Sequence, residues 1–261
     1  MAAASESCAD PRADARTPVR SGRYPRSMLN PNLDFAPYAR RLAETGRVQV
    51  RDFLDGASAA ALRDCLLQDV PWSLALRRDG ASRTLAHAEY AALSPAARQQ
   101  ELEAAYAEAR AGRYQFAYDS YMMVTAYLEG RDPGLLLHRV LEFLNAPPFI
   151  GWARQFTGDP RIRRTSAQAT CFRPGQFLNR HNDFDAEEGR LYAYVINLSP
   201  HWQPDWGGLL HFLDEHGEVV ESLQPHYNSL SLFKVPQMHF VSQVAPYATT
   251  ARQAITGWMQ S

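Results

Sequence analysis

The sequence predicts an α+β chain in which N-terminal helices support a C-terminal barrel or sandwich of short strands. The chain has 261 residues, of which 46% are hydrophobic and 21% charged, and this composition is typical of a globular domain. From about residue 165 onward, short β-like runs follow one another with turn residues between them. No helical segment separates these runs, so the parallel crossovers of a βαβ fold are excluded.

We expect three regions along the chain. Residues 1–27 are rich in Ala, Arg, Ser and Pro and show no apolar period, so they are interpreted as a disordered arm. A single domain is expected over 28–261. Its helical support occupies about 28–160, and its β core occupies about 161–261.

Capping residues and prolines predict the elements of the helical support. A short strand at 47–54 precedes a helix from Ser58, taken as its N-cap, to about Asp69. The Ser94-Pro95 pair predicts a second helix that ends near Gly112. A third helix is expected from about Pro133 to Asn145, followed by a short helix that contains Trp152.

The strands of the β core are predicted from β-branched and aromatic residues between turn signals. They are expected at Thr165 to Phe172, Leu191 to Leu198, Leu209 to Leu213, Ser229 to Val235, His239 to Val244 and Arg252 to Met259.

Net charge indicates which partners to expect, and cysteine content indicates the compartment. The formal net charge is −1 and the pI is near 6.7, so neither nucleic acid nor a membrane is expected as a partner. Cys8, Cys65 and Cys171 suggest no disulfide framework, and the first residues lack the apolar stretch of a signal peptide. We therefore expect a cytoplasmic protein.

Three residues of the β core have the chemistry of a metal site. His181 and Asp183 are two residues apart, and on an extended chain such side chains point to the same face. His239 begins a later β-like run, although it could be one more strand or loop histidine, like His201 and His211. Two histidines and one carboxylate are the ligand set of non-haem Fe(II) oxygenases.

An arginine adds a second element to this site. If 239–244 and 252–258 form a hairpin, Arg252 lies opposite Val241 and on the face of His239, with roughly 7–8 Å between the α-carbons of Arg252 and His239. A five-carbon 2-oxo diacid bound to the metal could then reach the Arg252 guanidinium with its far carboxylate. On the same face, Thr256 could add a hydroxyl donor, and Trp258 is interpreted as core filling.

Four motifs in order resemble a known family. They are the segment from Cys171 to Asp183, the segment from Trp206 to Leu213 with its glycine pair, the segment from Phe233 to Val241, and the segment Arg-Gln-Ala-Ile-Thr-Gly-Trp at 252–258. Together they resemble the prolyl-4-hydroxylase-like branch of the 2-oxoglutarate/Fe(II) oxygenases, which includes the hypoxia-type and ribosomal-protein prolyl hydroxylases. The resemblance covers roughly residues 160–260.

The resemblance implies a double-stranded β-helix, or jelly roll, as the core. It implies His181, Asp183 and His239 as iron ligands, and Arg252, assisted by Thr256, as the group that binds the C5 carboxylate of 2-oxoglutarate. The sequence departs from hypoxia-type enzymes at Val195, which replaces a tyrosine that holds the cosubstrate. Tyr192 or Tyr194 would serve only in a different register.

The expected function is Fe(II)- and 2-oxoglutarate-dependent hydroxylation with O₂, giving succinate and CO₂ as co-products. Beyond the metal ligands no catalytic side chain is needed, and ascorbate is a possible reductant. The expected substrate is a prolyl residue in a protein or peptide, and a free amino acid or other small molecule is the alternative. Two other functions stay open at this point: a non-catalytic, metal-binding cupin-like barrel, and a zinc hydrolase that uses the same triad.

Overall fold

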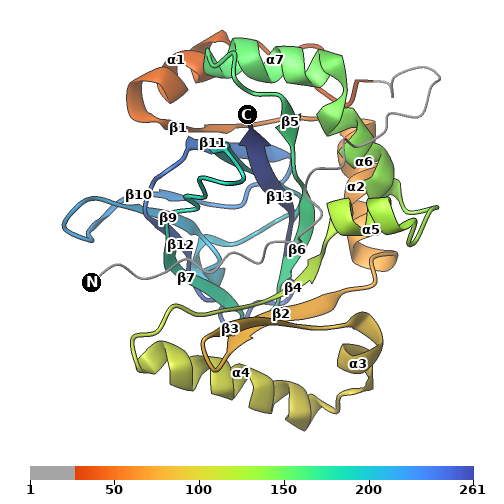
Figure 1. The fold of residues 1–261 in the computed structure, drawn as a ribbon, viewed down its shortest axis with the longest axis vertical. Coiled ribbons are helices and arrows are strands. Elements are labelled where there is room, and N and C mark those ends of the chain that lie inside the picture. The colour runs from red at the N-terminus through yellow and green to blue at the C-terminus, as the bar shows by residue number, and fades with distance from the viewer. Residues whose placement is uncertain (1–26) are drawn as a thin grey trace.

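The computed structural model describes residues 27–261, so the arm expected over 1–27 lies outside the described residues except for Ser27. A nearly closed antiparallel barrel occupies the centre of the molecule, and helices lie around its outside (Figure 1). The strands are β1 (Arg47–Val50), β2 (Ser73–Arg78), β3 (Ala81–Leu85), β4 (Phe116–Tyr121), β5 (Arg164–Thr165), β6 (Gln168–Phe172), β7 (Phe177–His181), β8 (Arg190–Asn197), β9 (Leu210–Leu213), β10 (Val219–Leu223), β11 (Ser229–Lys234), β12 (His239–Val241) and β13 (Arg252–Gln260).

The helices precede the strands of the C-terminal half. They are α1 (Ala36–Thr45), α2 (Gly56–Gln68), α3 (His87–Ala92), α4 (Pro95–Arg110), α5 (Met123–Glu129), α6 (Leu136–Asn145) and α7 (Pro147–Thr157), and a 3₁₀ turn, η1 (Pro204–Trp206), lies between β8 and β9. In Figure 1, α1 and α7 lie together at one end of the molecule, and α3 and α4 lie at the other end beside β2 and β3. Within residues 27–261, no helix has the length and apolar character needed to span a membrane.

The sheet order joins strands from both halves of the chain. The order is β1-β11-β8-β13-β6-β4-β7-β12-β9-β10, with β2 and β3 attached beside β4 and β5 attached to β13. The part expected to provide helical support therefore also supplies strands. Strand β4 lies between β6 and β7, and β1 pairs with β11 through Val50 and Leu230 at one end and Arg47 and Phe233 at the other.

The central strands of the barrel are buried on both faces. Strand β13 shows this directly, because Ile255 and Met259 pack with helix residues such as Leu62 and Leu144 in one apolar cluster. Trp258, from the opposite face of the same strand, packs in a second cluster with Phe172, Phe212 and Phe233. Alternate residues of each strand thus face either the helices or the barrel interior.

Most of the expected elements are present, with shifted ends. Helix α4 begins at Pro95, and Ser94 caps it by accepting a hydrogen bond from the amide of Ala97, as expected. Helix α2 begins earlier than expected, because Asp55 rather than Ser58 is its N-cap and accepts hydrogen bonds from the amides of Ala57 and Ser58. Strands β2, β3, β4, β7 and β10 were not expected as strands.

The hairpin expected between 239–244 and 252–258 is wrong. Strand β12 pairs with β7 and β9, whereas β13 pairs with β6 and β8. The cause lies in the segment after β12, where Val244 exchanges backbone hydrogen bonds with Gly175 and Gln176 in the turn between β6 and β7. The chain is thereby drawn across the barrel before β13 begins.

Gly257 leads to the first prediction. A β-carbon at this position would lie 2.0 Å from the carbonyl oxygen of Ser166 and 2.9 Å from the hydroxyl of Tyr194. We expect Gly257→Ala to lower the free energy of unfolding by about 1–3 kcal/mol or more, because a backbone group must move to make room. Urea unfolding followed by circular dichroism measures this change.

A second glycine provides the control for this prediction. Gly151 lies inside α7, and a β-carbon there would meet nothing within 4 Å. Gly151→Ala should therefore stabilise the protein by roughly 0.5–1 kcal/mol, since alanine is the better helix former. Equal stability of the two variants would contradict the close approach of β13 to Ser166.

Candidate metal centre and its surroundings

The structure brings His181, Asp183 and His239 together at one end of the barrel. His181 is the last residue of β7 and pairs in register with His239, the first residue of β12. The Nε2 atoms of His181 and His239 each lie 3.4 Å from a different carboxylate oxygen of Asp183. One ligand atom from each residue lies within 4.8 Å of the others, so the three could hold a metal ion.

Backbone carbonyls orient both imidazoles toward this point. His181 Nδ1 lies 2.9 Å from the carbonyl oxygen of Asn179, and His239 Nδ1 lies 2.8 Å from that of Gln237. A carbonyl oxygen only accepts, so each Nδ1 carries a proton, and Nε2 is the ring nitrogen through which each imidazole could bind a metal ion. This arrangement is typical of metal-binding histidines.

The protonation states suit a cation. Burial, together with repulsion from His181, lowers the pKa of His239 to about 4, so this imidazole is neutral at neutral pH. Burial alone would raise the pKa of Asp183, but the hydrogen bond and charge of His181 and the charge of His239 outweigh burial and hold that pKa below its usual value. The site therefore offers the imidazoles of His181 and His239 and the carboxylate of Asp183, which are nitrogen and oxygen donors suited to Fe(II).

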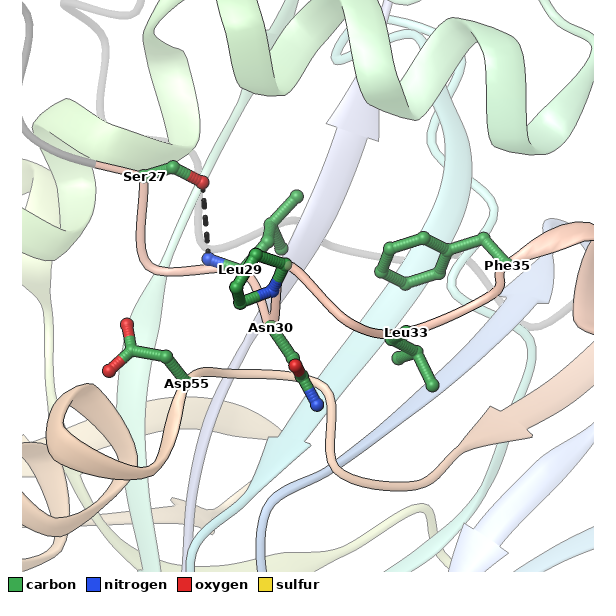
Figure 2. Close-up of a pocket in the computed structure, with 7 residues that line it drawn as sticks. Ser27, Leu29, Asn30, Leu33, Phe35 and Asp55 are labelled. Atoms are coloured by element: carbon green, nitrogen blue, oxygen red, sulfur yellow. Dashed lines mark hydrogen bonds between the residues drawn. The ribbon is translucent and has the colours of Figure 1, made fainter.

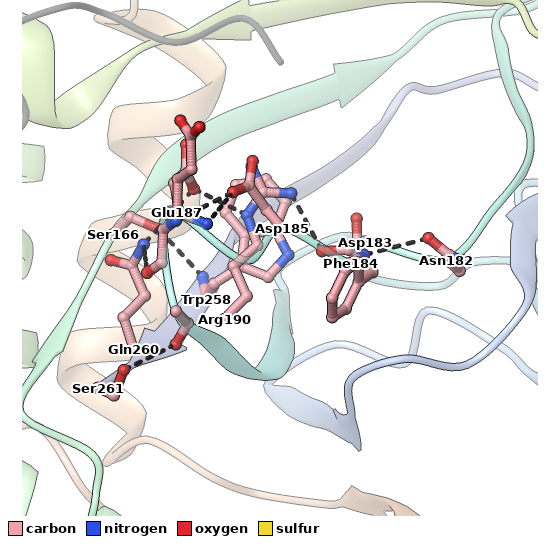
Figure 3. Close-up of polar contacts among 12 residues, drawn as sticks. Ser166, Asn182, Asp183, Phe184, Asp185, Glu187, Arg190, Trp258, Gln260 and Ser261 are labelled. Atoms are coloured by element: carbon pink, nitrogen blue, oxygen red, sulfur yellow. Dashed lines mark hydrogen bonds and ion pairs between the residues drawn. The ribbon is translucent and has the colours of Figure 1, made fainter. Parts of the chain in front are cut away.

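Asp183 is held in a tight turn after β7. Its φ of 59° lies in the left-handed region, which is uncommon for a residue with a side chain. Asn182 stabilises the turn by accepting a hydrogen bond at its side-chain oxygen from the amide of Phe184, 3.1 Å away. Arg190 donates to the carbonyl oxygen of Asp183 at 3.3 Å, as Figure 3 shows.

Arg190 ties the loop after Asp183 to the barrel wall. Its Nε lies 2.8 Å from Glu188 and its Nη2 lies 3.9 Å from Asp185, so both ends of the guanidinium face carboxylates (Figure 3). The same guanidinium lies 3.8 Å from the ring centroid of Trp258 on β13. Gln260 adds a hydrogen bond to the carbonyl oxygen of Glu188 at 3.1 Å. The loop that carries Asp183 is thus attached to β13 at several points.

Arg252 lies inside the barrel and is 3% exposed. Its guanidinium lies 5.2 Å from the ring centroid of Phe172, and its Nη2 lies 3.5 Å from the side-chain oxygen of Asn197. Within residues 27–261 no carboxylate pairs with Arg252, and its Nε has no hydrogen-bond partner. Burial lowers the pKa of Arg252 to about 10, which still leaves the group charged at neutral pH.

Thr256 and Val195 face each other in register on β13 and β8, on the interior face of the barrel, and both are only partly buried. Tyr192 and Tyr194 point to the opposite face, where they pack against the helices, and the hydroxyl of Tyr194 donates to the carbonyl oxygen of Ser166. Neither tyrosine therefore replaces the one that the family resemblance leads us to seek on β8. Asn197 is the polar side chain of β8 that reaches Arg252.

An aromatic ladder joins the two parts of the site. Tyr114 lies with its ring centroid 5.9 Å from that of His181, and the ladder continues through Phe116 and Tyr118, which stacks on Phe172 at 5.0 Å. Phe172 in turn lies under Arg252. Tyr118 thus faces the barrel interior. Tyr121 does not, since its hydroxyl bonds Asp132 and its ring packs among the helices.

Sequence reasoning missed Asn197 and Tyr114. Period-two alternation from Val195 places Asn197 on the interior face, but the family resemblance indicates a tyrosine as the cosubstrate-binding residue of this strand. No signal indicated Tyr114, which precedes a strand that was not expected.

Two surface pockets lie apart from these residues. One of about 510 Å³ is lined by Ser27, Leu29, Asn30, Pro31, Leu33, Phe35 and Asp55, as Figure 2 shows. The other, of about 280 Å³, lies between α4 and the outer face of the sheet. Neither lining includes a residue of the triad or Arg252, so the chemistry of the donor set, not pocket size, locates the site.

Comparison with known sequences finds relatives of the C-terminal part. Residues 167–260 match the family model of the 2OG-Fe(II) oxygenase superfamily. The prolyl 3-hydroxylase OGFOD1 of Mus musculus is 40% identical over 81 residues, and its Xenopus laevis counterpart is 36% identical over a stretch of the same length. The match to the Mus musculus protein spans 28% of this chain and only 15% of that relative.

Comparison with solved structures confirms the double-stranded β-helix. A Trichoplax adhaerens prolyl hydroxylase in complex with a peptide fragment of hypoxia inducible factor is similar with a TM-score of 0.56 at 17% identity, covering 85% of this chain and 86% of that one. A Pseudomonas putida prolyl-4-hydroxylase gives 0.52 at 16% identity, covering 87% and 92%. At these identities the likeness shows the fold alone. Residues 167–260, the region of the chain that is similar to the 2OG-Fe(II) oxygenase superfamily, include His181, Asp183, His239 and Arg252.

Proposed function

We propose that this protein is an Fe(II)- and 2-oxoglutarate-dependent dioxygenase that hydroxylates a prolyl residue in a protein. In this proposal His181, Asp183 and His239 hold Fe(II), and Arg252 with Thr256 holds the far carboxylate of 2-oxoglutarate. Ascorbate is included as the reductant that keeps the iron in its Fe(II) state.

The observation that carries the proposal is the buried Arg252. A guanidinium that is 3% exposed and has no carboxylate partner within residues 27–261 is costly to bury, unless an anion accompanies it. The aromatic cluster around it continues to the triad, because Phe233 and Phe212 of the same cluster contact His239. A metal-binding group and a carboxylate-binding group thus share one interior, which suits a chelating diacid.

The chain's own residues bind, orient and exclude water. When bound, Fe(II) supplies the oxidation chemistry, in which O₂ and 2-oxoglutarate give succinate, CO₂ and a hydroxylated substrate. Arg252 would fix the far end of the diacid with a planar pair of donors, and its position beside Phe172 keeps that contact dry. No side chain has to act as a base or nucleophile.

The surroundings of the triad favour a peptide over a free metabolite. Phe184, Met238 and Tyr114 are 56%, 40% and 41% exposed, although each lies beside a member of the triad. Exposed apolar side chains around a site fit an extended protein segment. Arg190, which could otherwise grip a free carboxylate, is already paired with Glu188 and Asp185. The relatives named as prolyl hydroxylases support the same substrate class.

The proposal is tested by incubating the full chain with Fe(II), 2-oxoglutarate and ascorbate in air. Proline-containing peptides, a protein extract of its host and free amino acids serve as substrates in separate reactions. We expect succinate release coupled to a +16 Da change on a prolyl residue, located by tandem mass spectrometry. Efficient hydroxylation of free L-proline, with no marked protein, would favour the small-molecule alternative.

Two further alternatives have separate outcomes. A cupin-like metal-binding barrel would bind Fe(II) without consuming 2-oxoglutarate. A zinc hydrolase would lack the visible absorbance band that an anaerobic Fe(II)/2-oxoglutarate complex produces, and it would be active with Zn(II).

A further inference from the structure

A buried polar ladder crosses the inner face of the barrel behind the proposed cosubstrate site. Its members are Arg252 on β13, Asn197 on β8, Ser231 on β11 and Gln49 on β1, and these strands are neighbours in the sheet. Arg252, Asn197 and Ser231 are each at most 3% exposed. A row of polar groups in an apolar interior is retained only where each group has a partner.

The ladder determines which way the Asn197 amide points. An arginine only donates, so the side-chain oxygen of Asn197 must face Arg252, 3.5 Å from its Nη2. The amide nitrogen then faces Ser229 and Ser231, whose hydroxyl oxygens lie 3.2 Å and 3.4 Å away. Both serine hydroxyls can accept these hydrogen bonds, so they fix the Asn197 amide with its oxygen toward Arg252.

At the far end of the ladder, Gln49 of β1 connects the two edges of the sheet. Gln49 donates from one amide nitrogen to the hydroxyl of Ser231 at 3.1 Å and to the carbonyl oxygen of Gln224 at 2.9 Å. Gln224 follows β10, the strand at the opposite edge of the sheet from β1. Gln49 therefore bridges the two edges and supports Ser231 at the same time.

We infer that Asn197 is the positioning residue for Arg252, and that its neutrality reserves the guanidinium charge for an anionic ligand. The amide of Asn197 orients the Arg252 guanidinium but does not neutralise its positive charge, so a carboxylate of the ligand must compensate that charge. A carboxylate side chain at position 197 would compensate the charge without any ligand. This inference rests on the proposed function, in which that ligand is 2-oxoglutarate.

The test is Asn197→Asp, which keeps the shape of the side chain and adds the charge. In the ligand-free protein we expect the melting temperature to rise by about 2–4 °C, because a buried unpaired cation gains a partner. The affinity of the Mn(II)-loaded protein for 2-oxoglutarate, measured by calorimetry, should fall by about a hundredfold, while Mn(II) affinity is unchanged. Asn197→Ala should weaken 2-oxoglutarate binding by about tenfold, without the rise in melting temperature.

Asn228→Asp is the matched control. Asn228 is a buried asparagine whose amide bonds the backbone of Leu54 at both ends, with no arginine in those contacts. This substitution should lower the melting temperature and leave 2-oxoglutarate affinity intact.

The outcomes separate the inference from the proposed function. If Asn197→Asp destabilises the protein as Asn228→Asp does, or binds 2-oxoglutarate as tightly as the unaltered chain, the inference is wrong. If the unaltered chain itself fails to bind 2-oxoglutarate, the proposed function is wrong, and the melting temperatures alone then decide whether Asn197 faces an uncompensated charge.

Discussion

Asp183→Ala is expected to abolish metal binding and all turnover of 2-oxoglutarate while leaving a folded protein. Asp183 is the only carboxylate in the group of three ligands, and both imidazoles point at its oxygens. Its removal leaves two imidazole donors and no negative charge to oppose the cation. Asp183→Glu should also be damaging, since the added methylene displaces an oxygen that a left-handed turn holds in place.

The measurement combines binding with stability. Mn(II) should raise the melting temperature of the unaltered chain and not that of Asp183→Ala, because a ligand stabilises only the state that binds it. Asp205→Ala is the control, since this aspartate is exposed on η1 and its side chain lies outside the site. Succinate production by Asp183→Ala comparable to that of the control would rule out the triad as the metal site.

Arg252→Lys is expected to weaken 2-oxoglutarate binding far more than metal binding. Lysine keeps the positive charge but replaces the planar guanidinium, with its pair of donors, by a single ammonium group. Its shorter side chain also loses the contact with the Phe172 ring. The loss of a charge-assisted bidentate contact should cost on the order of 1.5–3 kcal/mol, or roughly tenfold to over a hundredfold in affinity. Calorimetric titration of the Mn(II)-loaded variant with 2-oxoglutarate gives this number directly.

Arg180→Lys is the control for this prediction. Arg180 is exposed and adjacent to His181, so it is the nearest alternative along the chain for holding a carboxylate. It should bind 2-oxoglutarate like the unaltered protein. If Arg180→Lys is the variant that loses affinity and Arg252→Lys is not, the carboxylate lies at the mouth of the barrel instead of its interior.

The sequence predicted the chemistry of the site better than the geometry that assembles it. His181 and Asp183 were expected on one face of an extended strand, but β7 ends at His181 and a left-handed turn brings Asp183 back. Arg252 was expected beside His239 through a hairpin that does not form. In both cases the residue types were sufficient, because only certain side chains can bind a cation or a carboxylate, whereas strand pairing depends on distant segments.

The missed strands have a physical explanation. Strand β2 contains Ser-Leu-Ala-Leu-Arg-Arg, which has no alternation and resembles a helix by composition. Strand β10 is mostly exposed, with Val219 and Val220 half accessible, so burial imposes no pattern on it. Asn197 shows the complementary limit, because a buried asparagine can be recognised as functional only when the arginine that it contacts is known.

The position of β4 has a consequence for how the protein acquires its site. This strand separates β6 from β7, and β1 pairs with β11 across most of the chain, as in the Gln49 and Ser231 contact over 182 residues. Strand pairing between such distant segments forms late and slowly, because the chain loses the conformational entropy of closing long loops before the new contacts stabilise it. The segment 167–260 contains every proposed ligand but lacks the strand that joins β6 to β7. The site therefore matures only after the N-terminal half has folded into the same sheet, and the interval before closure leaves strand edges open to aggregation.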